Sequence, residues 1–148
     1  MVQKKYRIPV VLDTNSYIIR FLKHKRHGVN RRVYDLWIAE RKLQLIVSPP
    51  IIAEYIGTLR MLGASEKFLR MRQTRFTAAS NVTLINVGKR LSLSRDPKDN
   101  VFLETAHAGK ANFLITRDHD LLDIPKANLR GFRFKIVTPS NFLQQVGE

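Results

Sequence analysis

Acidic residues are few in this sequence, and two of them stand where an enzyme could use them. The 148 residues include 12 Asp and Glu against 26 Lys and Arg, which gives a formal net charge of +14. Asp13 directly follows the apolar run Ile8–Leu12, and Asp118 lies two residues beyond the apolar run Phe113–Thr116. In open α/β sheets, ligands bind at the carboxyl ends of the strands, where the strand order reverses. We therefore expect Asp13 and Asp118 to meet at a ligand-binding edge.

Four further acids fall in segments that could face the same edge. Glu54 lies one and a half turns into a predicted helix, Asp99 lies in the first turn of another, and Asp96 and Asp120 are close in sequence to Asp99 and Asp118. Carboxylates held close together repel one another, and a cation between them relieves the repulsion. The sequence has no cysteine, and its four histidines show no zinc-ligand spacing. The remaining ligands are oxygens, which suit Mg²⁺ or Mn²⁺.

Several of these acids also have a purely structural interpretation. Asp13 could cap a helix that begins after the first strand, and Asp120 could be a solvated or capping residue. Asp96 precedes Pro97, a pattern typical of a helix cap followed by proline at the first helical position. The sequence alone leaves both interpretations open for these three residues.

The elements that must position these acids alternate along the chain. Between short apolar runs, apolar residues follow helical spacing. Ser48, Asp96 and Thr138 each precede a proline and predict capped helix starts, while Gly63 and Gly109 predict helix ends. This alternation predicts an α/β fold in one domain, residues 1–148. Five apolar runs predict strands buried on both faces: Ile8–Leu12, Leu43–Val47, Val82–Ile85, Phe113–Thr116 and Phe134–Val137.

The composition restricts the class of protein. With 44% apolar and 26% charged residues, the chain has the composition of a globular protein and not of a disordered basic tail. No apolar run approaches the roughly 20 residues that span a bilayer, and the apolar run near the N-terminus is too short for a signal peptide. We therefore expect a soluble cytoplasmic protein. The excess of positive charge favours a polyanionic partner, either nucleic acid or an anionic membrane. Of these, we expect RNA and no membrane partner.

Four segments share an order and a spacing with a known family: Val10–Asn15, Ser48–Glu54, Arg95–Asp99 and Leu114–Leu122. Together they resemble a PIN domain, and the sequence is most similar to the toxin-component PIN proteins of bacteria and archaea, relatives of VapC. The ending Phe134–Leu143 fits the last strand and helix of that group. The resemblance covers nearly the whole chain and implies a three-layer α/β/α fold with a central parallel sheet of about five strands.

The resemblance also implies an activity and partners. It implies a metal-dependent endoribonuclease that uses Mg²⁺ or Mn²⁺, cleaves single-stranded or loop RNA to 3′-hydroxyl and 5′-phosphate ends, and is the toxin of a toxin–antitoxin pair. A small antitoxin protein and a homodimer would be its protein partners. Asn100 stands where this group is expected to have another acid. The implied residues are Asp13, Glu54, Asp99 and Asp118 as catalytic metal ligands, Asp96 and Asp120 as auxiliary acids, and Thr14, Asn15 and Thr116 as polar groups that support the ligands or position the substrate.

The basic residues form dense clusters that could contact phosphates or simply be solvated. One surrounds residues 23–32, and a second, residues 60–75, includes Arg72 and Arg75. The residues that we expect to contact RNA are Lys23, Lys25, Arg26, Arg31, Arg32, Arg95 and Arg117.

Other functions remain open from the sequence. A non-catalytic RNA- or DNA-binding module would use the basic residues and keep the acids only as caps. A housekeeping RNA-processing PIN nuclease would share the site but not the antitoxin, and a histidine acid–base ribonuclease would need no metal. A phosphohydrolase with Asp13 as nucleophile is disfavoured, because Asn15 stands where that class has a second aspartate.

Overall fold

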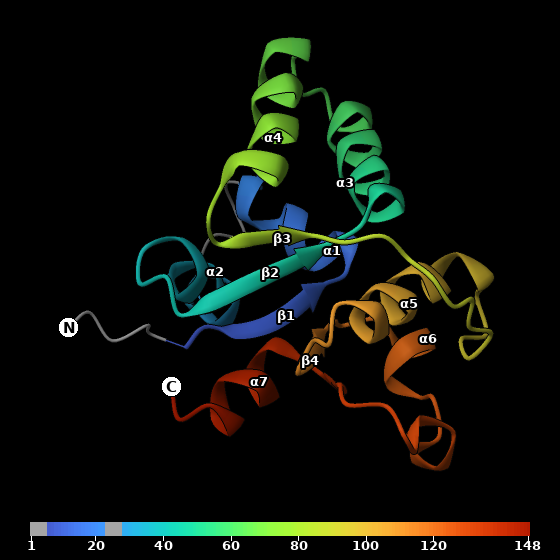
Figure 1. The fold of residues 1–148 in the computed structure, drawn as a ribbon. Helices are drawn as coiled ribbons and strands as arrows, with labels where there is room; N and C mark the ends of the chain where they lie inside the picture. The colour runs from blue at the N-terminus through green and yellow to red at the C-terminus, as the bar shows by residue number, and fades with distance from the viewer. Residues whose placement is uncertain (1–5, 23–27) are drawn as a thin grey trace.

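A five-stranded parallel sheet organises the computed structural model, which describes residues 6–22 and 28–148. Its strand order is β3-β2-β1-β4-β5, and each neighbouring pair is parallel (Figure 1). The α/β fold with about five parallel strands is thus confirmed. The strands are β1 (Ile8–Leu12), β2 (Leu43–Val47), β3 (Val82–Leu84), β4 (Phe113–Ile115) and β5 (Lys135–Val137).

Three of the predicted strands are one residue too long. Ile85 and Thr116 still donate backbone hydrogen bonds to Val47 and Val137, but the chain leaves the regular ladder at both positions. At Thr116 the reason is visible, because its hydroxyl donates a hydrogen bond to Asp13 and accepts one from the Asp118 N–H. Phe134 is buried but precedes the first paired residue of β5.

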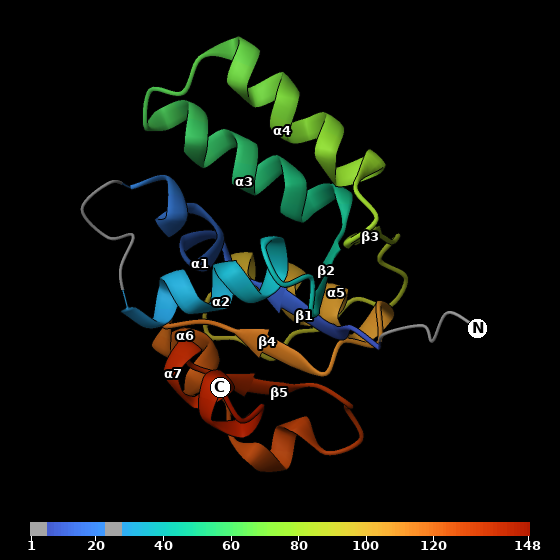
Figure 2. The same cartoon turned by 90° about the vertical axis from the view of Figure 1, so that its left-hand side faces the viewer.

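Helices cover both faces of the sheet and form an arm at one edge. Helices α2 and α7 contact each other and the strands on one face, while α5 packs against β1, β2 and β4 (Figures 1 and 2). Helices α3 and α4 pair and extend from the β3 side. The α-helices are α1 (Thr14–Ile18), α2 (Gly28–Ile38), α3 (Pro49–Met61), α4 (Glu66–Ala78), α5 (Asn100–Ala108), α6 (His119–Leu122) and α7 (Pro139–Gln145). The 3₁₀ turns are η1 (Ile19–Phe21), η3 (Pro97–Asp99) and η4 (Lys126–Leu129).

The core explains why the apolar runs become strands. Val10 and Val11 of β1 and Leu45 and Val47 of β2 are at most 1% exposed, because helices cover both faces of these central strands. Burial of each such side chain contributes roughly 1.5–3 kcal/mol, which is why the runs are continuously apolar and do not alternate. In the part of the chain that the structure describes, no helix is long and apolar enough to cross a membrane.

The predicted helix boundaries are mostly confirmed. Thr138 accepts a hydrogen bond from the Asn141 N–H at the start of α7, and Gly63 ends α3 with a φ of 93°. Ser48 was expected to cap α3 with its side chain, and this is wrong. Its buried hydroxyl is 2.7 Å from the hydroxyl of Thr105 on α5 and is used there instead.

Candidate metal centre

The acidic residues gather at the point where the strand order reverses. From β1 the sheet continues to β2 and β3 on one side, and the chain then crosses to β4 and β5 on the other. The carboxyl ends of β1 and β4 lie side by side, because Leu12 pairs with Ile115. Asp13 and Asp118 follow these two ends, so the topology brings together residues more than 100 positions apart. This is the edge where open α/β sheets bind their ligands.

Asp13 is held rigidly by two hydrogen bonds. It is 5% exposed; one carboxylate oxygen accepts a hydrogen bond from the Ser16 N–H at 2.8 Å, and the other accepts one from the Thr116 hydroxyl. The same Thr116 oxygen accepts a hydrogen bond from the Asp118 N–H at 2.9 Å. Burial raises the pKa of Asp13, and these hydrogen bonds only partly offset it. Asp13 therefore caps α1 and also presents a carboxylate to the edge of the sheet.

Asp99 has a strongly raised pKa. Burial raises its pKa from 3.8 to about 7, and repulsion from Asp118, a hydrogen bond with Asp118, and the charges of Asp96 and Asp120 add to the shift. Its Oδ2 atom is buried and has no hydrogen-bond partner among residues 6–22 and 28–148. A buried carboxylate oxygen without a partner is costly unless a proton or a cation sits beside it.

The two auxiliary acids come close to Asp99. One oxygen from each of Asp96, Asp99 and Asp120 lies within 4.8 Å of the others. Asp96 also caps η3 by accepting a hydrogen bond from the Lys98 N–H at 3.0 Å, so its capping interpretation is confirmed without removing it from the cluster. Arg95 lies 3.1 Å from Asp120, where it offsets part of the negative charge.

Glu54 approaches the cluster from α3. Its pKa is raised chiefly by burial, and Asp13 and Asp96 raise it further, so it lies within electrostatic reach of both. The Thr14 hydroxyl is 3.4 Å from its Oε2 atom. The side chain of Asn15 is exposed, and no hydrogen bond joins it to an acid within the described residues. The structure thus brings Thr14 and Thr116 to the acids, but not Asn15.

Two side chains that the sequence did not mark as functional fix the loop before Asp96. Asn100, at the position where another acid was expected, accepts hydrogen bonds from the N–H groups of Leu93 at 3.2 Å and Ser94 at 3.0 Å. Glu104 is 3% exposed and accepts a hydrogen bond from the Leu91 N–H at 2.8 Å. The available signal was a carboxylate in the middle of the apolar stretch that becomes α5.

The predicted RNA-contacting residues have different surroundings. Arg31 lies 3.0 Å from Asp35, and Arg32 pairs with Glu40 and Glu148, so both cations already face carboxylates of this chain. Arg117 is exposed beside Asp118 and forms no ion pair within the described ranges. Lys23, Lys25 and Arg26 lie outside the described residues.

The donor set fits a small divalent cation. Six carboxylates converge from four parts of the chain, three of them have raised pKa values, and one buried oxygen lacks a partner among the residues that the structure describes. Mg²⁺ and Mn²⁺ prefer carboxylate oxygens and complete their coordination with water or phosphate. A cation there would offset the repulsion from Asp118, Asp96 and Asp120 that adds to the effect of burial on the pKa of Asp99.

Comparison with known proteins agrees with this arrangement. The family model of the PIN domain matches residues 9–120. The uncharacterized protein MJ1680 of Methanocaldococcus jannaschii is 30% identical over 154 residues, covering 96% of this chain and 94% of that protein. Two solved structures share the fold with a TM-score of 0.52 and 16% identity: VapBC2 of Rickettsia felis bound to a DNA fragment from its promoter, and PAE2754 of Pyrobaculum aerophilum. They cover 87% and 95% of this chain, and this chain covers 97% and 91% of theirs.

Proposed function

Because the chain belongs to the PIN domain family, we propose that it is a divalent-metal-dependent endoribonuclease. The observation that carries the proposal is the buried Oδ2 atom of Asp99, which lies in a cluster of carboxylates and has no hydrogen-bond partner among the residues that the structure describes. The net charge of +14 supports an anionic polymer as substrate, because a basic surface around an acidic site attracts a phosphate backbone. Single-stranded or looped RNA is the proposed form of that substrate.

We assign the metal ligands to the acids at the edge of the sheet. Asp13, Glu54, Asp99 and Asp118 would hold Mg²⁺ or Mn²⁺, with Asp96 and Asp120 as auxiliary ligands. When bound, the metal supplies a water of lowered pKa and neutralises charge that develops on the phosphate. Hydrolysis of the phosphodiester to a 3′-hydroxyl and a 5′-phosphate would need no part of the RNA 2′-hydroxyl.

Neighbouring hydroxyl groups would hold the ligands in place. The Thr116 hydroxyl donates to Asp13 and accepts from the Asp118 N–H, so a single side chain fixes the spacing of two proposed ligands. The Thr14 hydroxyl donates one hydrogen bond, to Glu54 alone. Asn15, exposed at the start of α1, would contact the RNA strand rather than an acid. Arg117, exposed next to Asp118, would contact a phosphate.

The biological role that we propose is that of a toxin in the cytoplasm. VapBC2, which shares the fold at 16% identity, is one solved example of the VapBC type. By this likeness, a small antitoxin would cover the acidic site, and the protein would form a homodimer. A housekeeping RNA-processing nuclease with the same site is the alternative, and a search for growth arrest on expression in a heterologous host separates the two roles.

A cleavage assay tests the activity. End-labelled, mixed-sequence single-stranded RNA is incubated with Mn²⁺, with Mg²⁺ and with EDTA, and the product ends are mapped. The wild type should give 5′-phosphate ends only with metal, and Asp13→Asn and Asp99→Asn should lose activity by orders of magnitude. Glu66→Gln is the matched control, because Glu66 is an exposed acid on α4 that pairs with Arg60.

Two outcomes would overturn the proposal. Cleavage in EDTA, or a cyclic phosphate at the product ends, would favour a histidine acid–base ribonuclease. Metal-independent, salt-sensitive binding of RNA with no cleavage of any tested RNA would favour a non-catalytic binding module.

A further inference from the structure

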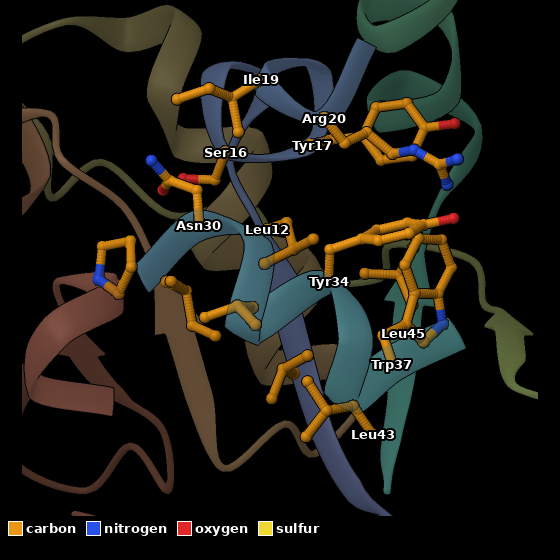
Figure 3. Close-up of a pocket in the computed structure, with 14 residues that line it drawn as sticks. Leu12, Ser16, Tyr17, Ile19, Arg20, Asn30, Tyr34, Trp37, Leu43 and Leu45 are labelled. Carbon is orange, nitrogen blue, oxygen red and sulfur yellow. The ribbon is translucent and has the colours of Figure 1, made fainter. Parts of the chain in front are cut away.

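The Asp13 side of the acidic site is held by the packed core. Asp13 follows Leu12 of β1 and precedes Tyr17 of α1, and these two apolar neighbours are at most 6% exposed. Figure 3 shows Leu12, Ser16 and Tyr17 around a cavity of only about 20 Å³, so these elements have little space in which to move. The Ser16 N–H and the Thr116 hydroxyl then fix the carboxylate. The position of Asp13 therefore follows from the core and from two hydrogen bonds.

The acids on the other side of the site are carried by different structure. Asp96 lies at the end of residues 85–96, a stretch that forms neither helix nor strand, and Asp120 lies in α6, a helix of four residues. Both side chains are partly exposed. One oxygen of each nevertheless lies within 4.8 Å of the other and of Asp99. A direct link between the loop and α6 would maintain this spacing.

The Ser94 hydroxyl forms such a link. It donates a hydrogen bond of 3.2 Å to the backbone carbonyl of Asp120 and accepts one of 3.3 Å from the Asp96 N–H. The backbone N–H of Ser94 in turn donates to the side-chain oxygen of Asn100 at 3.0 Å. Asn100 begins α5, which packs against β1, β2 and β4. Hydrogen bonds thus connect the core, through Asn100 and Ser94, to the segments that carry both acids.

We propose that Ser94 is a positioning residue of the metal site: its hydroxyl maintains the separation of Asp96 and Asp120, and Asn100 holds Ser94 in place. The Thr116 hydroxyl has the equivalent task on the opposite side of the site. Groups that orient metal ligands typically contribute about 10–100-fold to metal affinity. This role rests on the metal site proposed above and adds to it two residues that carry no charge.

Direct measurement of Mn²⁺ binding separates positioning from a general effect on folding. The electron paramagnetic resonance signal of free Mn²⁺ gives the dissociation constant of the metal-stripped protein at pH 7.5, and thermal unfolding in EDTA gives the stability of each variant. Ser94→Ala should weaken Mn²⁺ binding about tenfold or more. Its melting temperature in EDTA should fall no further than that of the control variant.

Ser65→Ala is the matched control. Ser65 caps α4 by accepting a hydrogen bond from the Phe68 N–H at 3.2 Å and lies outside the acidic cluster. Its loss should lower the melting temperature, because a helix cap is removed, and should leave the affinity for Mn²⁺ unchanged.

Two variants of Asn100 test the same link from its other end. Asn100→Leu removes the acceptor for the Ser94 N–H and should weaken Mn²⁺ binding about as much as Ser94→Ala does. Asn100→Asp keeps an acceptor oxygen and should bind Mn²⁺ at least as tightly as the wild type. If Asn100→Leu does not fold, Ser94→Ala decides the question.

The outcomes distinguish the role of Ser94 from the metal site itself. A Ser94→Ala protein that binds Mn²⁺ as tightly as the wild type would overturn the role of Ser94 and leave the metal site in place. Equal weakening by Ser65→Ala would overturn it as well, because the effect would then be one on folding. Failure of the wild type to bind Mn²⁺ would overturn the metal site and, with it, the role of Ser94.

Discussion

Replacing Asp99 by asparagine should stabilise the metal-free protein while removing its response to metal. In the folded protein the pKa of Asp99 is raised from 3.8 to about 7. A raised pKa means that the folded protein favours the protonated carboxyl. The contribution of the Asp99 carboxyl to the free energy of unfolding is therefore greatest below pH 4 and is lost as the pH rises through 7. The asparagine side chain of the variant has no charge to bury, and its amide could donate a hydrogen bond to Asp118.

The size of the effect follows from the shift. A pKa raised from 3.8 to about 7 corresponds to a loss of ~4 kcal/mol in the free energy of unfolding at high pH, before any reduction for screening by water. Because Asp99 is only half-buried, water screens part of this, and we take about half, ~2 kcal/mol. For a chain of this size that is an increase in melting temperature of about 4–8 °C for Asp99→Asn at pH 8.5. About half of the pH effect should develop between pH 5.5 and 8.5 in the wild type.

The assay is thermal unfolding followed by circular dichroism in EDTA at pH 5.5, 7 and 8.5. The melting temperature of the wild type should fall over this range more than that of Asp99→Asn. Glu66→Gln is again the control, because its exposed carboxylate has a pKa lowered by Arg60 and lies outside the cluster. An Asp99→Asn variant that melts at or below the wild-type temperature at pH 8.5 would refute the electrostatic account of the site.

Three further predictions concern other residues of the site and its support. Added Mn²⁺ should raise the melting temperature of the wild type at pH 7.5. At a hundredfold excess of Mn²⁺ over its dissociation constant, the free energy of unfolding should increase by about 2.7 kcal/mol. The melting temperature of Asp99→Asn should remain nearly unchanged in the same experiment. Thr116→Val removes the donor to Asp13 and the acceptor for the Asp118 N–H, so it should cost about 1–3 kcal/mol in urea unfolding and lower the rate of RNA cleavage even at saturating metal; equal rates would contradict its positioning role. Gly109→Ala would place a Cβ 2.3 Å from Ile46 on β2 and should destabilise by about 1–3 kcal/mol, whereas Gly57→Ala, with open space around its Cα in α3, should stabilise by up to about 1 kcal/mol in the same measurement.

The sequence predicted the parts of the fold that depend on local pattern. The buried runs Ile8–Leu12 and Leu43–Val47 became strands with the predicted bounds, because helices on both faces require continuous apolar residues there. The position of Asp13 and Asp118 at adjacent strand ends was also predictable, since parallel strands share one carboxyl edge.

What the sequence could not predict depends on contacts across the chain. Ser48 has the local pattern of a helix cap, yet its hydroxyl bonds to Thr105, which is 57 residues away. Asn100 looked like the loss of a charge, but it clamps the backbone of Leu93 and Ser94. A cavity of about 460 Å³ likewise joins residues of α1, α2 and α4, and helical spacing alone did not indicate that Arg20 and Arg72 line it together.

The central position of β1 also determines when the site can form. Asp13 is completed by Thr116, and the two residues are separated by 103 positions. A growing chain therefore carries Asp13 and Glu54 long before it carries their partners, and the closure of such long loops comes late in folding. The candidate site can assemble only after β4 has been synthesised and has paired with β1. If the chain cleaves RNA, it therefore stays inactive for most of its own translation. The order of the strands would then protect the ribosome and the messenger RNA that make it from cleavage by the incomplete chain.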